Sequence, residues 1–211
     1  MEPKVTVALI HHPVLDRRGE EIASTVDHFD VMDGSRLSLT YPIWRFYVVN
    51  HVPAQRALVE RLIAHGNAAA SRDTARGSFS KTAWAPDLDT VIAEHEDELG
   101  QSPTVVATSA KASPKTIGAP ALRQRIAGGE PILVLFGKAW GLAPRLLDST
   151  PLRLCPVDGG TGFNHLSVRS AMAIVIDRLL APPLTSGQDP IEGLDQDLGG
   201  QRFVEHGGRR R

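Results

Sequence analysis

The segment that decides the fold lies in the second half of the chain, where residues 131–180 read PILVLFGKAWGLAPRLLDSTPLRLCPVDGGTGFNHLSVRSAMAIVIDRLL. The apolar run Pro131–Phe136 is typical of a buried strand, and a glycine turn separates it from a short helix expected at Leu142–Ser149. A short strand is expected at Leu152–Cys155, followed by a long apolar helix at His165–Leu180. Strands and helices in this order predict a parallel sheet with helices packed against it.

The residues before this segment continue the same alternation of strands and helices. Strands are expected at Lys4–His11, Trp44–Val49, Lys81–Trp84 and Thr104–Thr108. Helices are expected at Ala54–His65, Asp87–Leu99 and Ala119–Ala127. The pattern therefore predicts an α/β fold, with a parallel sheet covered by helices on both faces as an α/β/α sandwich.

Length and composition favour one domain followed by a tail. The chain has 211 residues, of which 42% are hydrophobic, enough for a single sizeable core. We expect this domain to span residues 1–181. Residues 182–211 are rich in Gly, Asp, Gln and Arg and are expected to be a disordered tail.

The chemistry of the chain also limits where the protein works. Cys155 is the single cysteine, so no disulfide can form within the chain, and we expect a buried structural thiol and a cytoplasmic setting. No signal peptide is visible, and no apolar run approaches the roughly 18 residues of a membrane span. The net charge of −1 gives no overall basic bias. A local excess of Arg and Lys within residues 45–82 fits either phosphate contacts or an ordinary solvated face.

Several familiar sites are absent. Gly137-Lys138 lacks the earlier glycine and the following Ser or Thr of a phosphate loop, and the glycines at 159–162 lack the third glycine of a dinucleotide fingerprint. His95-Glu96 is not followed by the second histidine of a zinc-protease helix. His11 and His12 are neighbours on a strand and point apart, so we predict no metal site.

What remains is a set of three strands that each end in a small-residue turn. The turns begin at Thr108, Gly137 and Cys155, and ligands of open parallel sheets bind beyond the carboxyl ends of strands. Asn164 is expected to be the N-cap of the last helix and Asp33 that of an early one. Taken singly, these residues need no explanation beyond turn and cap chemistry; together they predict a ligand pocket made of three turns.

Three motifs in the chain resemble those of a known family. Residues 10–14 read IHHPV, residues 107–110 read ATSA, and residues 164–171 read NHLSVRSA. With the strand, Phe-Gly turn and Gly-Leu of residues 132–142, they resemble the SpoU–TrmD (SPOUT) superfamily. Within it, residues 5–180 are similar to a bacterial family of TrmD-like RNA methyltransferases of undefined target.

The resemblance implies a fold, a cofactor and a partner. The C-terminal third would be threaded into a deep trefoil knot, and two copies would form a homodimer through the knot and the last helix. That helix is apolar on nearly every side, which also favours a partner subunit. S-adenosylmethionine (SAM) would be held mainly by backbone groups of Thr108, Ser109, Ala110, Phe136, Gly137, Gly141, Leu142, Cys155, Val157, Asn164, Leu166 and Ser167.

The resemblance also implies residues at the methyl acceptor. Relatives carry an arginine on the first helix, and here Arg36 takes that position. Arg36, Asn164 and Ser167 are therefore the predicted catalytic residues. His12 and His165 can exchange protons near neutral pH, and Arg169 is expected to pair across a dimer or to bind phosphate.

These observations predict a SAM-dependent RNA methyltransferase acting on tRNA or rRNA. A second hypothesis is a SPOUT-fold protein that binds SAM or RNA without catalysis. A third is an ordinary, unknotted doubly wound nucleotide enzyme. The sequence leaves open the target nucleotide and the choice between base nitrogen and ribose 2′-oxygen.

Overall fold

The computed structural model describes residues 4–70, 79–111 and 113–182, and most of the expected tail lies outside this range. Seven strands form one sheet in the order β5-β4-β1-β8-β6-β9-β7, and every pair of neighbours is parallel. The parallel α/β prediction is confirmed. The strands are β1 (Val5–Ile10), β4 (Arg45–Val49), β5 (Thr82–Ala85), β6 (Thr104–Ala107), β7 (Thr116–Ile117), β8 (Ile132–Gly137) and β9 (Leu152–Leu154).

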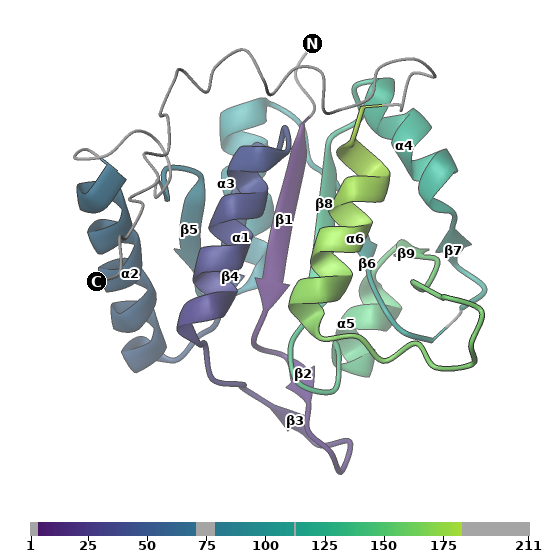
Figure 1. Ribbon diagram of the computed structural model, residues 1–211, viewed down its shortest axis with the longest axis horizontal. Helices are drawn as coiled ribbons and strands as arrows, with labels where there is room; N and C mark the ends of the chain where they lie inside the picture. Colours follow the sequence, from purple (N-terminus) through teal and green to yellow (C-terminus); the bar gives the residue numbers. More distant parts are fainter. Residues whose placement is uncertain (1–3, 71–78, 112, 183–211) are drawn as a thin grey trace, which may run out of the picture. The chain divides into compact units, whose positions relative to one another are not determined.

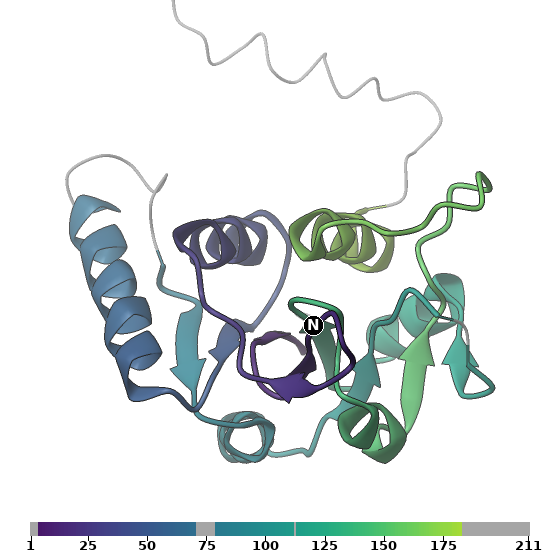
Figure 2. The same cartoon turned by 90° about the horizontal axis from the view of Figure 1, so that it is seen from below.

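Within the described residues, six helices cover the two faces of this sheet. They are α1 (His28–Thr40), α2 (Pro53–Ala70), α3 (Leu88–Leu99), α4 (Ala119–Ala127), α5 (Pro144–Ser149) and α6 (Val168–Leu180). Helices α1 and α6 lie side by side on one face, with α2 and α4 flanking them, whereas α3 and α5 cover the other face (Figures 1 and 2). The α/β/α layering follows the sequence prediction.

The core shows why the strands are apolar at nearly every position. Along β1, Val7 and Leu9 pack with α1 and α6, while Ala8 and Ile10 pack with α3 and α5. A sheet buried on both faces cannot alternate between apolar and polar residues. A small antiparallel pair that the sequence did not predict, β2 (Val14–Leu15) and β3 (Glu21–Ile22), follows β1.

The helix boundaries correct two predicted caps. Helix α1 is capped by Asp27, whose carboxylate accepts a hydrogen bond from the Asp30 amide while Asp30 bonds back, so Asp33 lies inside the helix. Helix α6 begins at Val168, three residues later than expected, because Ser167 rather than Asn164 is its N-cap. The end of α3 at Gly100, with a φ of 70°, is as predicted.

Gly34 explains how α1 lies close to the sheet. A Cβ atom at this position would come within 2.1 Å of the Phe46 ring on β4. Only glycine therefore allows this separation between helix and sheet. The same helix carries Arg36 toward its exposed side.

Candidate functional site

The three predicted turns lie side by side because their strands are neighbours in the order β8-β6-β9. The amide and the hydroxyl of Thr108 both donate to the Leu135 carbonyl, at 3.0 and 2.8 Å. The Asn164 side-chain amide donates to the Ala110 carbonyl at 2.7 Å. The first turn is therefore bonded to β8 on one side and to the segment before α6 on the other.

The turn after β8 is held tightly by the β2 segment. The Lys138 amide donates to Ile10, the Trp140 amide to Leu15 and the Leu15 amide to Gly141, at 3.0, 3.0 and 2.9 Å. A Cβ atom on Gly137 would lie 2.5 Å from the Leu142 amide nitrogen, so glycine is required there. Gly141 has a φ of 102°, a conformation that favours glycine.

Two residues predicted to bind the cofactor in this turn face the core. The side chains of Phe136 and Leu142 are buried in the two separate cores of the sheet. A ligand in the site can reach them only through their backbone groups. This agrees with the expectation that backbone atoms make these contacts.

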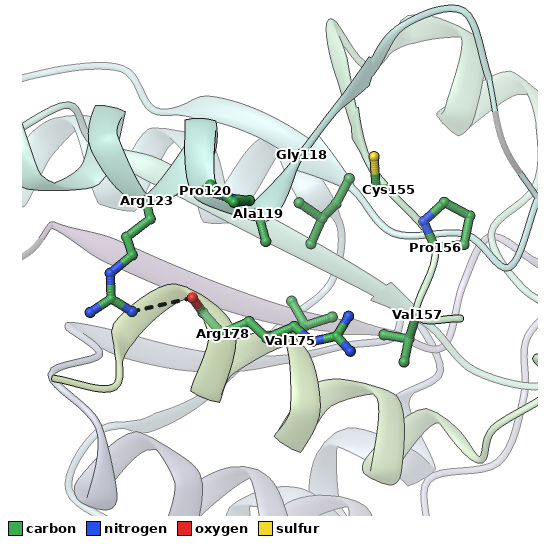
Figure 3. Close-up of a pocket in the computed structure, with 10 residues that line it drawn as sticks. Gly118, Ala119, Pro120, Arg123, Cys155, Pro156, Val157, Val175 and Arg178 are labelled. Atoms are coloured by element: carbon green, nitrogen blue, oxygen red, sulfur yellow. Dashed lines mark hydrogen bonds between the residues drawn. The ribbon is translucent and has the colours of Figure 1, made fainter. Parts of the chain in front are cut away.

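The turn after β9 borders an apolar pocket of about 530 Å³ between α4 and α6 (Figure 3). Cys155 and Val157 line it, together with Pro156, Val175 and the first residues of α4. Cys155 is exposed, so the expected buried thiol is wrong: β9 ends at Leu154 and leaves the cysteine in the loop. The other predicted cofactor residues are not among the pocket's lining residues.

A second pocket, of about 440 Å³, lies between α1 and α6 and is lined by both Arg36 and Ser167. Its wall includes an ion pair in which Arg169 bonds to Asp33 at 2.8 Å. Arg169 therefore has a partner within its own chain, and the expected dimer or phosphate contact stays a prediction. Asn164 does not line this pocket, so the structure brings together two of the three predicted catalytic residues.

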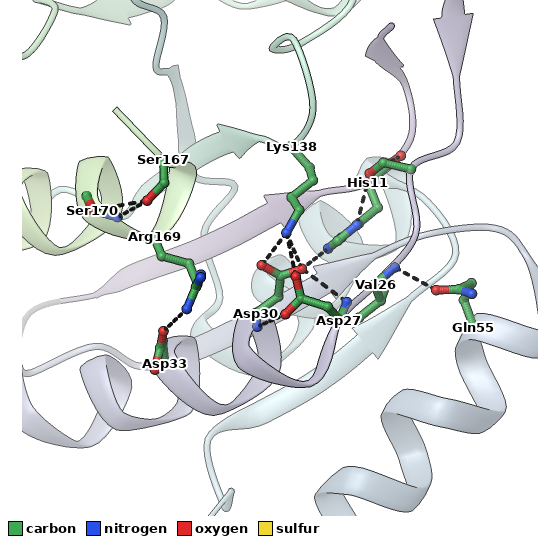
Figure 4. Close-up of polar contacts among 11 residues, drawn as sticks. His11, Val26, Asp27, Asp30, Asp33, Gln55, Lys138, Ser167, Arg169 and Ser170 are labelled. Carbon is green, nitrogen blue, oxygen red and sulfur yellow. Dashed lines mark hydrogen bonds and ion pairs between the residues drawn. The ribbon is translucent and has the colours of Figure 1, made fainter. Parts of the chain in front are cut away.

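A partly buried ionic cluster joins α1 to the turn after β8 (Figure 4). The Lys138 ammonium lies 2.6 Å from both carboxylate oxygens of Asp30 and 3.0 Å from Asp27. Asp30 is fully buried, and the Nε2 atom of His11 lies 3.8 Å from its carboxylate. The sequence prediction missed this cluster, because only the folded chain brings residues 11, 27, 30 and 138 together.

Burial sets the protonation of this cluster. Burial raises the pKa of Asp30, against the opposing hydrogen bond from Lys138. Burial alone would raise the pKa of Asp27, but hydrogen bonds from Lys138 and the Asp30 amide hold this pKa below its usual value. Burial, with the nearby Lys138 charge, lowers the pKa of His11 to about 4, so this imidazole is neutral at neutral pH.

The two histidines proposed for proton exchange lie outside this cluster. The His12 ring is 4.1 Å from the His51 ring, and its Nε2 is 3.6 Å from Glu21. Burial and His51 lower the pKa of His12. His165 is exposed and contacts Phe163. Among the described residues, no group of three or more His, Cys, Asp and Glu side chains is arranged to hold a metal ion.

Comparisons with known proteins agree with this geometry. A tRNA (guanine-N(1)-)-methyltransferase of Oleidesulfovibrio alaskensis is 34% identical over 180 residues, which are 84% of this chain and 42% of the relative. An uncharacterized protein of Aquifex aeolicus is 33% identical over 181 residues, covering 84% of this chain and 88% of the relative. The chain thus spans less than half of the tRNA methyltransferase.

Solved structures show the same fold at low sequence identity. The SpoU methyltransferase AviRb of Streptomyces viridochromogenes superposes with a TM-score of 0.53 at 14% identity, over 85% of this chain and 59% of that one. No helix in the described ranges is both long and apolar enough to cross a membrane.

The model of a family of SAM-dependent RNA methyltransferases matches residues 4–181, and the chain belongs to this family.

Proposed function

We propose that this chain transfers a methyl group from SAM to tRNA or rRNA. The observation that carries the proposal is the meeting of three turns at the carboxyl ends of β6, β8 and β9, tied by the Asn164–Ala110 and Thr108–Leu135 hydrogen bonds. Membership of the family supplies the cofactor and the substrate class. Because the chain spans less than half of the guanine-N(1) relative, that specificity is not transferred to it.

The residues present fit a nucleoside cofactor. The pocket beside Cys155 and Val157 is lined mostly by apolar residues, together with Arg123 and Arg178, and its volume of about 530 Å³ is in the range of small-molecule sites. Backbone groups of residues 108–110, 137, 141 and 155–157 would hold the cofactor, with residues 164–167 closing over it.

The chemistry is divided between cofactor and protein. When bound, SAM supplies a methyl group bonded to a sulfonium sulfur. The sulfur leaves as a neutral thioether, so the methyl group needs little further activation. The three turns orient it, and Arg36 offers a permanent positive charge to an RNA phosphate or an anionic acceptor. Ser167 lines the same pocket as Arg36, but its hydroxyl accepts the Ser170 amide as a helix cap, which favours a positioning role.

We also propose the knot and the homodimer that the SPOUT resemblance implies. Strand β9 lies beyond β6, yet α6 returns across the sheet to lie beside α1 (Figure 1). Residues 155–167 must therefore pass back across the turns at the carboxyl edge, where a knot would form. The partly exposed apolar residues of α6 and the exposed Phe29 of α1 support a dimer through this face.

Two measurements test the proposed function. Calorimetric titration with SAM should give a binding signal, and purified protein should transfer labelled methyl groups to total RNA from cells lacking it. Arg36→Ala should lower transfer while leaving SAM affinity within about twofold, whereas Arg125→Ala, in the last turn of α4, should change neither. Binding without transfer to any RNA preparation would support the non-catalytic hypothesis, and a folded protein that does not bind SAM would contradict the proposal.

A further inference from the structure

Trp140 is a large aromatic side chain that the fold leaves in water. It is 66% exposed, on the turn between β8 and α5. The other two tryptophans are covered: Trp44 lies under Arg45 and against His95, and Trp84 lies under Arg56. Singly exposed apolar side chains are common on protein surfaces, but an indole offers a large flat face together with a polar N–H and can stack on a ligand.

The turn that carries Trp140 is anchored on two sides. Its backbone is bonded to Leu15 through the Trp140 and Gly141 peptide groups, at 3.0 and 2.9 Å. Its first residue, Lys138, is fixed by the ion pair with Asp30. The backbone that carries the indole is therefore held in place before any ligand arrives, which lowers the entropy cost of binding.

Two exposed arginines lie on the adjacent loop. Leu15 leads directly into the turn that carries Arg17 and Arg18. Asp16 in this turn is occupied by the amides of Arg18 and Glu20, at 2.7 and 2.9 Å, and Glu21 pairs with Arg145. Arg17 and Arg18 are exposed, and their charges balance those of Asp16 and Glu20, so the proposed phosphate contact depends on the two guanidinium groups and not on a net positive charge of the loop.

We propose that Trp140 is the stacking platform for an unpaired base of the RNA substrate, with Arg17 and Arg18 contacting the flanking phosphates. The inference rests on the proposed function and adds a substrate class to it: RNA whose target lies in a loop or a single strand. Exposed aromatic rings stack on unpaired bases, and adjacent cations pair with the phosphate backbone. A base inside a duplex cannot present its face to the indole.

The experiment compares Trp140→Ala, Trp140→Phe and the control Leu58→Ala, which removes an exposed apolar side chain from α2. Binding is measured by fluorescence anisotropy with a labelled RNA hairpin carrying an unpaired loop and with a blunt duplex of the same stem. Stacking of one base corresponds to roughly tenfold or more in affinity. Trp140→Ala should weaken hairpin binding by this factor, Trp140→Phe should retain most of it, and Leu58→Ala should match the wild type.

Calorimetry with SAM and size-exclusion chromatography separate the possible failures. Because the turns would hold SAM through backbone groups, these side-chain changes should leave SAM binding as in the wild type, and all variants should elute at the same volume. Wild-type affinity for the hairpin in Trp140→Ala, equal affinity of the wild type for hairpin and duplex, or a changed oligomeric state in Trp140→Ala would overturn the inference while leaving the proposed function intact. A wild type that binds neither SAM nor RNA would overturn both.

Discussion

The turns after β6, β8 and β9 and the N-terminal half of α1 face the same region but are held in different ways. The turns are held by main-chain hydrogen bonds and by a glycine that admits Leu142. Helix α1 is joined to the turn after β8 by the ion pair of Asp30 with Lys138, and to α6 by that of Asp33 with Arg169. The proposed cofactor side is thus fixed by backbone geometry, whereas the proposed acceptor side depends on charge.

The buried pair gives the largest expected effect. Lys138→Met leaves the fully buried Asp30 carboxylate beside Asp27 without its cation. Removing one partner of such a pair should lower the free energy of unfolding by about 3 kcal/mol, measured by urea denaturation. Lys115→Met, which removes an exposed lysine bonded to the Asp148 carbonyl, should cost far less. The double variant Lys138→Met/Asp30→Asn should regain most of the lost stability. If Lys138→Met and Lys115→Met were equally stable, the claim that the Lys138–Asp30 ion pair holds α1 to the turn would be contradicted.

The second effect is a dependence of stability on pH. Folding lowers the pKa of His11 from its ordinary value of 6.5 to about 4, so the unfolded chain binds the proton more tightly. The contribution of neutral His11 to the free energy of unfolding is therefore complete above pH 6.5. It is lost as the pH falls toward 4, by about 3 kcal/mol in all. Urea denaturation across this window should show a shallower pH dependence in His11→Asn than in the wild type. The exposed His165→Asn should keep the wild-type slope, and an unchanged slope in His11→Asn would contradict the expectation.

The third prediction concerns the backbone of the turn after β8, on the proposed cofactor side. Gly137→Ala places a methyl group against the Leu142 amide, so the turn must shift. We expect a loss of about 2 kcal/mol in stability and a clear loss of SAM affinity, measured by thermal unfolding and calorimetry. Gly159→Ala adds the same methyl group where nothing lies within 4 Å. If the two alanine variants bind SAM equally, the turn after β8 does not shape the cofactor site.

The smallest effect belongs to the exposed ion pair between α1 and α6. The Arg169 and Asp33 side chains are 39% and 35% exposed, so solvent screens their attraction. Asp33→Asn should lower stability by less than about 1 kcal/mol, and the loss should shrink in high salt. Thermal unfolding at two salt concentrations measures this. A loss as large as that of Lys138→Met would mean that both pairs carry equal weight in holding α1.

Sequence reasoning worked best where local pattern decides the structure. The apolar run at Pro131–Phe136 became β8, and Ala119–Ala127 matched α4. The three turns could be expected to meet because strand ends of a parallel sheet share one edge. Main-chain contacts explain the success, since they depend on strand order more than on particular side chains.

The same reasoning failed where distant side chains decide the structure. Asp33 was expected to cap α1, yet Asp27 does so, because the helix begins at His28 and includes Asp33 in its interior. The Lys138–Asp30 pair joins residues 108 positions apart, which no local pattern reveals. The roles of Arg36, Asn164 and Ser167 in catalysis remain predictions, although two of these residues meet in one pocket.

The central claim is that SAM lies against the three turns, and hydrogen–deuterium exchange tests it most directly. With saturating SAM, amides in residues 108–111, 137–142 and 155–167 should exchange more slowly, while α3 (Leu88–Leu99), on the opposite face of the sheet, should be unchanged. Protection confined to other parts of the chain, or none at a SAM concentration that saturates binding, would contradict the account.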